Sequence, residues 1–221
     1  MKQSNLNIEQ NKSVSTRERI FMTAVDLFSQ RGFSGVSVRD ITREVGINES
    51  SMYNHFKNKE ALLEAIFEYF KTDIGGAIYP EEEVEGMIDR IGPLAFMEQS
   101  LDLFIQRLGS PVMNKIGRIL TIEQFANENI RWLLEQQIFE LPRCIYTKAF
   151  AKMIKDGAIQ PFEPELLADE YLAYSVSLYY EYAVVKHEFI EADRIKALVS
   201  RHIEFFWSRI KQQVEGRDIR E

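Results

Sequence analysis

The chain has few residues that interrupt helices and almost none that can cross-link it. It contains only 6 prolines and 11 glycines among 221 residues, which favours long helices over many short strands and turns. Its single cysteine, Cys144, excludes an intramolecular disulfide framework and suits a reducing compartment. Because 45% of the residues are hydrophobic and 12% aromatic, the chain can build a packed core. We therefore expect an all-α globular protein.

Long apolar segments are missing as well. The N-terminal residues are polar and lack the apolar stretch of a signal peptide. The longest apolar segment runs from Tyr171 to Tyr180 and contains two serines, and it is too short to span a bilayer. These absences predict a cytoplasmic protein with no membrane partner.

Sequence signatures of common active sites are also absent. The chain has no phosphate-binding glycine-rich loop, no H-E-x-x-H motif and no paired C-x-x-C. Its histidines, His55, His187 and His202, are scattered along the chain, which does not fit a metal site. We expect no enzyme activity, no catalytic residue, no cofactor and no metal; an all-α enzyme is a distant alternative.

The charge is unevenly distributed. The net charge of the chain is -7, yet residues 1–60 hold 9 basic and 7 acidic residues and so carry a small positive charge. A chain that is acidic overall but near-neutral over residues 1–60 fits a protein that contacts nucleic acid with one end only.

Residues 37–56 have the dimensions of a helix-turn-helix. Before them, a capping box at Ser15 opens a helix that ends near Gly32. Ser37 is then the expected N-cap of a short helix that stops at Gly46, and Asn48 caps the next, which runs to about Phe56. We expect a flexible arm over 1–14, a helix-turn-helix DNA-binding domain over 15–62, and a larger helical domain over 63–221.

The rest of the chain is predicted to be helical throughout. The expected helices cover about 81–91, 93–108, 111–125, 128–156, 164–187 and 191–214. Pro142 lies inside the fourth of these, where it should kink or split the helix because it removes an N–H donor.

The exposed side of the second motif helix carries polar side chains suited to base edges. They are Glu49, Ser50, Ser51, Tyr53 and Asn54. Tyr53, His55 and Lys59 are donors that could hold phosphates, and the free N–H groups at the helix starts near Ser37 and Lys59 offer further phosphate sites. By pattern alone, two short amphipathic helices around a glycine can equally be simple packing.

The stretch from Arg17 to Leu63 resembles the N-terminal domain of TetR-family transcriptional repressors. The resemblance rests on Gly32-Phe33, on the run from Ser37 to Ile41, on Val45-Gly46-Ile47, on Met52-Tyr53 with His55-Phe56, and on the run from Lys57 to Leu63. It implies phosphate contacts for Ser37, Tyr53, His55 and Lys59, and base reading by Arg39, Glu49, Ser50 and Asn54. The family often has a basic or neutral residue in place of Glu49, so this side chain either reads cytosine or points away.

The resemblance implies a C-terminal body with an effector pocket and a dimer interface. Candidate pocket residues are apolar or aromatic: Phe70, Met87, Phe96, Met97, Phe104, Phe125, Trp132, Phe139, Cys144 and Tyr174. Candidate dimer residues lie on the last two predicted helices: Leu172, Val176, Tyr179, Tyr180, Ala183, Leu198, Ile203, Phe206, Trp207 and Ile210. Both sets can equally form ordinary core.

The favoured interpretation is a regulator, most simply a repressor, that binds a palindromic operator as a homodimer and is released by a small apolar effector. The alternative is a helical interaction or structural protein whose N-terminal motif serves packing only. Steep salt dependence of binding to an inverted repeat separates the two.

Overall fold

The computed structural model describes residues 15–75, 79–181 and 192–212. Within these ranges the chain is helical and forms no strand, apart from an isolated antiparallel bridge between Ile159 and Lys211. The predicted all-α class is confirmed. Backbone contacts divide the chain into two compact units, Met1–Glu68 and Tyr69–Glu221. This division falls within helix α4, so a domain boundary after residue 62 stays a prediction, and the expected arm over 1–14 lies outside the described residues.

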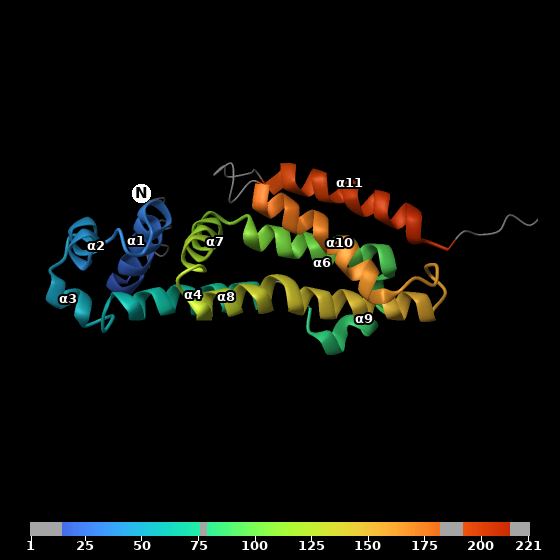
Figure 1. Cartoon of the computed structure of the whole chain (residues 1–221), viewed down its shortest axis with the longest axis horizontal. Coiled ribbons are helices and arrows are strands. Elements are labelled where there is room, and N and C mark those ends of the chain that lie inside the picture. Colours follow the sequence, from blue (N-terminus) through green and yellow to red (C-terminus); the bar gives the residue numbers. More distant parts are fainter. Residues whose placement is uncertain (1–14, 76–78, 182–191, 213–221) are drawn as a thin grey trace, which may run out of the picture. The chain divides into compact units, whose positions relative to one another are not determined.

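Unit 1 is built from short helices that pack around one apolar cluster. They are α1 (Thr16–Arg31), α2 (Val38–Val45), α3 (Glu49–Tyr53) and the first part of α4 (Lys59–Gly75), shown in blue to teal in Figure 1. Helix α2 packs against both α1 and α3. The fully buried side chains of this unit are apolar: Ile20, Ala24, Val25, Phe28, Ile41, Met52, Leu62 and Ile66.

The predicted helix starts are found where local side chains can cap them. The Ser15 hydroxyl accepts from the N–H of Glu18 at the start of α1. The Asn58 carbonyl oxygen accepts from the N–H of Ala61 at 2.8 Å at the start of α4. Each bond satisfies an N–H that has no partner within its helix.

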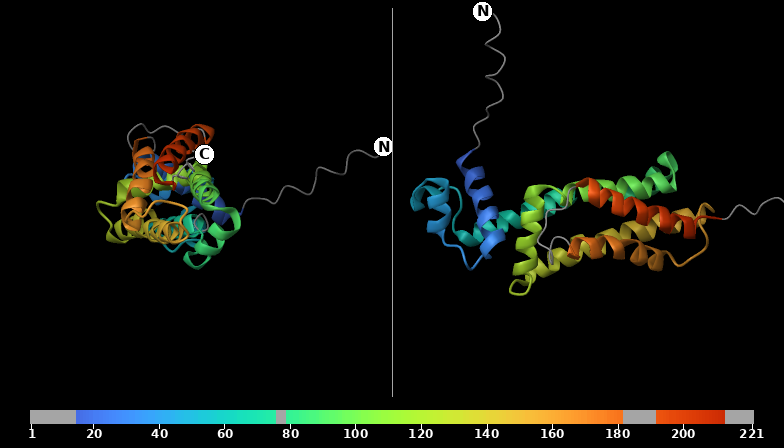
Figure 2. Two further views of the ribbon diagram at one scale, coloured as in Figure 1. Left: turned by 90° about the vertical axis from the view of Figure 1, so that its right-hand side faces the viewer. Right: turned by 90° about the horizontal axis from the view of Figure 1, so that it is seen from above.

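Unit 2 contains the remaining helices of the described chain. They are a 3₁₀ turn (η1, Glu81–Glu83), α5 (Val84–Ile91), α6 (Pro93–Leu108), α7 (Pro111–Glu123), α8 (Glu128–Leu134), a π-helical segment (η2, Glu135–Glu140), α9 (Leu141–Lys155), α10 (Pro164–Tyr179) and α11 (Ala192–Ile210). Helix α9 packs against α5 and α10, and α11 packs against α6. The right-hand view of Figure 2 shows α9 beside α10 and α6 beside α11. The helices predicted over 164–187 and 191–214 extend beyond the residues that the structure describes.

Pro142 changes the type of helix rather than ending it. The π-helical segment Glu135–Glu140 lies between α8 and α9 and ends two residues before the proline, and the three follow one another without a gap, as the yellow ribbon labelled α8 and α9 in Figure 1 shows. A proline cannot donate to a carbonyl of the preceding turn, and a wider π turn accommodates such a break. The expected disturbance at Pro142 is therefore present as a bulge in a continuous helix.

Aromatic rings fill the centre of unit 2. The ring of Tyr171 lies 4.8 Å from that of Tyr146, 5.9 Å from Phe150 and 5.4 Å from Phe206. Two buried hydroxyls are satisfied there: the Tyr171 hydroxyl donates to the carbonyl oxygen of Met97 at 3.0 Å, and Ser100 and Tyr146 share a hydrogen bond of 2.9 Å. The core thus ties α6, α9, α10 and α11 together.

Candidate nucleic-acid interface

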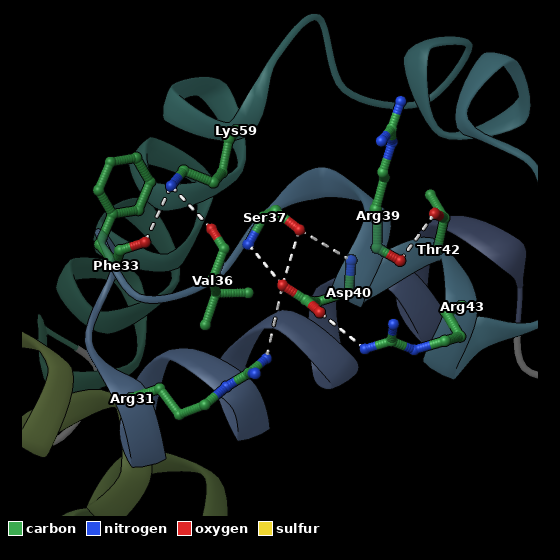
Figure 3. Close-up of polar contacts among 9 residues, drawn as sticks. All are labelled: Arg31, Phe33, Val36, Ser37, Arg39, Asp40, Thr42, Arg43 and Lys59. Carbon is green, nitrogen blue, oxygen red and sulfur yellow. Dashed lines mark hydrogen bonds and ion pairs between the residues drawn. The ribbon is translucent and has the colours of Figure 1, made fainter.

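Helix α2 begins with a reciprocal capping box. The Ser37 hydroxyl oxygen accepts from the N–H of Asp40 at 3.2 Å, while the N–H of Ser37 donates to Asp40 Oδ2 at 2.9 Å. The hydroxyl also donates to the same carboxylate oxygen at 2.7 Å. These bonds from Ser37, with the guanidinium groups of Arg31 and Arg43, lower the pKa of Asp40 to about 2. Figure 3 shows Asp40 at the centre of this network, where its charge links the end of α1 to α2.

The turn between α2 and α3 depends on a glycine. Gly46 has φ 76° and ψ 38°, a left-handed conformation that residues with a Cβ rarely adopt. The carbonyl oxygen of Thr42 accepts from the N–H groups of Gly46 and Ile47, each at 3.0 Å. Asn48 then caps α3 by accepting from the N–H of Ser51 at 2.7 Å. The turn predicted at Gly46 to Asn48 is confirmed.

Three cationic side chains brace the motif from outside it. Arg19 donates to the carbonyl oxygen of Val45 at the end of α2, and Arg17 donates to the carbonyl oxygen of His55 at 2.6 Å beyond the end of α3. Lys59 Nζ donates to the carbonyl oxygens of Phe33 and Val36 at 2.9 and 2.8 Å. The Arg19 cation suits the carbonyl oxygen at the C-terminus of α2, where the helix dipole is negative.

The bracing roles of Arg17 and Arg19 could not be found from the sequence. Their partners lie 38 and 26 residues away, and no local pattern marks such pairs. Arg17 also stacks over the ring of Phe56, with its guanidinium carbon 4.2 Å from the ring centre. The motif is therefore held as one rigid piece by contacts that only the fold reveals.

The predicted DNA-contact residues differ in their exposure and in the hydrogen bonds that their polar groups make. The side chain of Tyr53 is 49% exposed, and Asn54 is exposed too. Ser51 and His55 are half-buried. The hydroxyls of Ser37 and Ser50 are engaged, because each donates to a neighbouring capping side chain, Asp40 and Asn48 respectively.

The Lys59 ammonium is turned inward. It binds two backbone carbonyls and lies 4.0 Å from the centre of the Phe33 ring, as Figure 3 shows. A phosphate contact through this group would have to replace those bonds. The predicted phosphate role of Lys59 stays untested, and its contacts in the structure belong to folding.

Arg39 and Glu49 form an ion pair across the motif. Arg39 Nε donates to Glu49 Oε1 at 2.9 Å, with 83% and 44% of the two side chains exposed. The Arg39 guanidinium points away from the Asp40 network in Figure 3. Glu49 therefore holds an arginine of the neighbouring helix, and whether it also reads a base stays a prediction.

The predicted effector-pocket residues differ widely in exposure. Phe96 and Met97 are fully buried core residues, Phe70 is 1% exposed, Met87 and Tyr174 are half-buried, and Phe139 and Cys144 are exposed. Phe125 and Trp132 are 86% and 60% exposed, and their assignment to a pocket stays a prediction. The side chain of Phe104 lies outside the described part of the chain.

The predicted dimer residues are likewise divided between core and surface. Ile203 and Ile210 are 2% and 4% exposed and lie within the core of unit 2. The expectation that these two side chains form surface contacts in a dimer is therefore corrected. Leu198, Phe206 and Trp207 are partly buried against the same core. Tyr180 is 59% exposed. Ala183 and the side chain of Tyr179 lie outside the described residues.

An apolar groove runs beside helix α10. It has a volume of about 500 Å³ and is lined by Phe139, Leu172, Val176 and Tyr180, among others. An ion pair between Arg143 and Asp169 at 2.7 Å stands at its wall. Part of the predicted dimer surface is therefore exposed and concave.

Within residues 15–75, 79–181 and 192–212, no group of three or more His, Cys, Asp or Glu side chains could hold a metal ion. No helix in the same ranges is long and apolar enough to cross a membrane.

The motif is a glycine turn between two capped helices that are braced as one piece, and it presents Arg39, Tyr53 and Asn54 outward. These features define a helix-turn-helix DNA-binding protein. Residues 20–66 match the family model described as bacterial regulatory proteins, tetR family. Over these residues the chain is similar to the DNA-binding domain of bacterial regulatory proteins of this family.

The known relatives match this chain over different lengths. The HTH-type transcriptional regulator UidR of Escherichia coli is 27% identical over 176 residues, which are 73% of this chain and 88% of UidR. The HTH-type transcriptional repressor KstR2 of Mycolicibacterium smegmatis is 35% identical over 60 residues, 27% of this chain and only 29% of KstR2. The crystal structure of AibR in complex with isovaleryl coenzyme A and operator DNA is 19% identical, covers 85% of this chain and 97% of AibR, and has a TM-score of 0.58. This last likeness shows the fold alone.

Proposed function

We propose that the chain is a cytoplasmic, homodimeric repressor that binds a palindromic operator and is released by a small apolar effector. The observation that carries the proposal is the set of exposed donors on a rigid helix-turn-helix, Arg39, Tyr53 and Asn54. Such donors suit base edges and phosphates in a major groove. One head reads one half-site, so a dimer with two-fold symmetry reads an inverted repeat.

Repression and the binding of an effector are supported by the relatives. KstR2 is named a repressor, and AibR was crystallised with both operator DNA and isovaleryl coenzyme A. In our proposal an effector binds unit 2 and favours a conformation that holds DNA poorly. It can shift the equilibrium only by its difference in affinity between the two conformations.

The dimer is supported by the apolar groove along α10. Val176 and Tyr180 offer apolar surface there, and Leu172 lines the same groove. A helix face of this kind is stabilised when a second copy covers it. The two heads of the dimer then supply the two readers that a palindrome needs.

Selection from a random DNA library tests the proposal. The full chain should enrich an inverted repeat, and footprinting of the DNA upstream of its own gene should show protection of the same sequence. Recovery of no common sequence, with no retention of DNA at low salt, would leave the rival interpretation of a helical interaction protein.

A further inference from the structure

Arg39 differs from Arg17, Arg19, Arg43 and Lys59 in which of its donors are engaged. Arg17, Arg19 and Lys59 donate to backbone carbonyl oxygens. Arg43 pairs with Asp40 in the first turn of α2. The Arg39 side chain is 83% exposed, and the ion pair with Glu49 uses its Nε. Both terminal nitrogens of the guanidinium stay available on the exposed side of the motif.

The contact through Nε fixes the direction of the guanidinium. An arginine has five N–H donors in a planar fork, and four of them remain on the terminal nitrogens when Nε is engaged. Two of those donors match the O6 and N7 acceptors that guanine presents in the major groove. The Arg39 group is therefore held in a state suited to bidentate reading.

We propose that Glu49 is a positioning residue for Arg39, and that Arg39 so held reads a guanine in each half-site. The inference rests on the proposed function, because it specifies how the same helix-turn-helix selects its DNA. Glu49 touches no base in this account; it acts through Arg39.

Charge considerations favour this role over direct reading by Glu49. A free carboxylate near the phosphate-rich surface of DNA is repelled, whereas one paired with an arginine is largely neutralised. Glu49 Oε1 already accepts from Arg39 at 2.9 Å, so accepting from a cytosine N4 would compete with that bond. An ion pair this exposed adds little to stability, so its main consequence is the orientation of the arginine before DNA arrives.

The test compares base preference among full-length variants. The DNA is the inverted repeat selected by the parent protein, together with versions in which each base pair of the half-site is replaced in turn. The variants are Arg39→Ala, Glu49→Ala, Glu49→Gln and Glu44→Ala. Glu44 is a matched control, since it is an exposed acid on α2 with no partner among the hydrogen bonds and ion pairs of the described residues. Thermal unfolding of each variant checks that the fold is intact.

Arg39→Ala should remove the preference for guanine at one position of each half-site. Glu49→Ala should lower the preference at that same position, on the order of tenfold, with an unchanged melting temperature. Glu49→Gln, which keeps an acceptor oxygen, should retain part of the preference, and Glu44→Ala should retain all of it. A merely structural role for Glu49 would lower affinity for every DNA alike.

Two results would overturn the inference. One is a loss of preference in Glu49→Ala at a base pair different from the one that Arg39→Ala affects, which would mean that Glu49 reads a base itself. The other is equal behaviour of Glu49→Ala and Glu44→Ala. If the parent protein selects no sequence at all, the proposed function fails, and this outcome is distinct from both.

Discussion

The ammonium group of Lys59 closes the loop between α1 and α2. It donates to the carbonyl oxygens of Phe33 and Val36 and lies over the Phe33 ring. Buried carbonyls without a donor are costly, and hydrogen bonds to a charged group are stronger than those between neutral groups. This single side chain therefore helps to set where α2 begins.

Replacing Lys59 with methionine should destabilise unit 1. The variant keeps the apolar stem but removes the Lys59 donor from both carbonyls, and only that of Phe33 keeps another donor, the N–H of Val36 at 3.3 Å. We therefore expect a loss of about 2 kcal/mol in the free energy of unfolding. Chemical denaturation followed by circular dichroism measures it. The matched control is Lys57→Met, an exposed lysine two residues away, which should change stability by no more than about 0.5 kcal/mol. Equal effects of the two substitutions would show that the Lys59 bonds are unimportant.

Asp40 makes stability depend on pH in the acid range. Its pKa is lowered from 3.8 to about 2 by Ser37, Arg31 and Arg43, so the folded state favours the ionised carboxylate. The resulting stabilisation is present above pH 3.8 and is lost as the pH falls towards 2. Asp40→Asn should therefore be less stable than the parent at pH 7, and the difference should shrink below about pH 4. Urea midpoints of both proteins across that range measure the effect; a difference independent of pH would contradict it.

At the scale of helices, the packing of α6 against α9 includes a buried polar contact. Ser100 and Tyr146 share a hydrogen bond of 2.9 Å inside an apolar core. Burial raises the pKa of Tyr146 to about 12, so its phenol remains neutral at physiological pH. The pair orients Tyr146 among the rings that join α9 to α10.

Removing one partner of this pair should cost more than removing both. Ser100→Ala leaves the buried Tyr146 hydroxyl with a missing partner, and we expect a loss of about 1–3 kcal/mol. Adding Tyr146→Phe should recover part of that loss, because no unsatisfied hydroxyl remains. Unfolding free energies of the two single variants and the double variant form the test. Simple additivity would mean that the two hydroxyls do not interact.

Helix starts could be predicted from the sequence because their causes are local. Ser37 and Asn48 each bind an N–H three residues ahead, and the positive φ at Gly46 needs only the glycine itself. The cross-helix contacts could not be predicted in the same way. The partners of Arg17 and Lys59 lie 38, 26 and 23 residues away, and only the folded arrangement of unit 1 brings them together.

The candidate surfaces of unit 2 were the least predictable part of the chain. Helical spacing indicates which residues are apolar, but not whether a given face meets another helix or solvent. Ile203 was expected at a dimer surface and is buried, whereas Trp132 was expected in a pocket and is 60% exposed. Spacing alone therefore does not identify the surface that a second copy would cover, and each exposed apolar residue has to be tested by its own substitution.

The proposed dimer predicts a contrast between two exposed aromatic residues. Tyr180→Asp places a charge in the groove beside α10 and should shift sedimentation towards a monomer of 25.8 kDa. Trp132→Asp changes a residue that is equally exposed but lies on α8, and it should leave the dimer intact. The reverse result would place the interface on α8, and a parent that sediments only as a monomer would exclude both.

The central claim is that the helix-turn-helix of unit 1 binds DNA through phosphates and base edges. Its most direct test is the equilibrium affinity for the selected inverted repeat as a function of salt. The parent should lose affinity by about a thousandfold between about 50 and 200 mM salt, because many phosphate contacts release counterions. Tyr53→Phe should bind about tenfold more weakly than the parent at each salt concentration, while Tyr69→Phe, which lies in unit 2, should match the parent. An affinity that does not change with salt, or an equal affinity for the repeat and for scrambled DNA, would contradict the account.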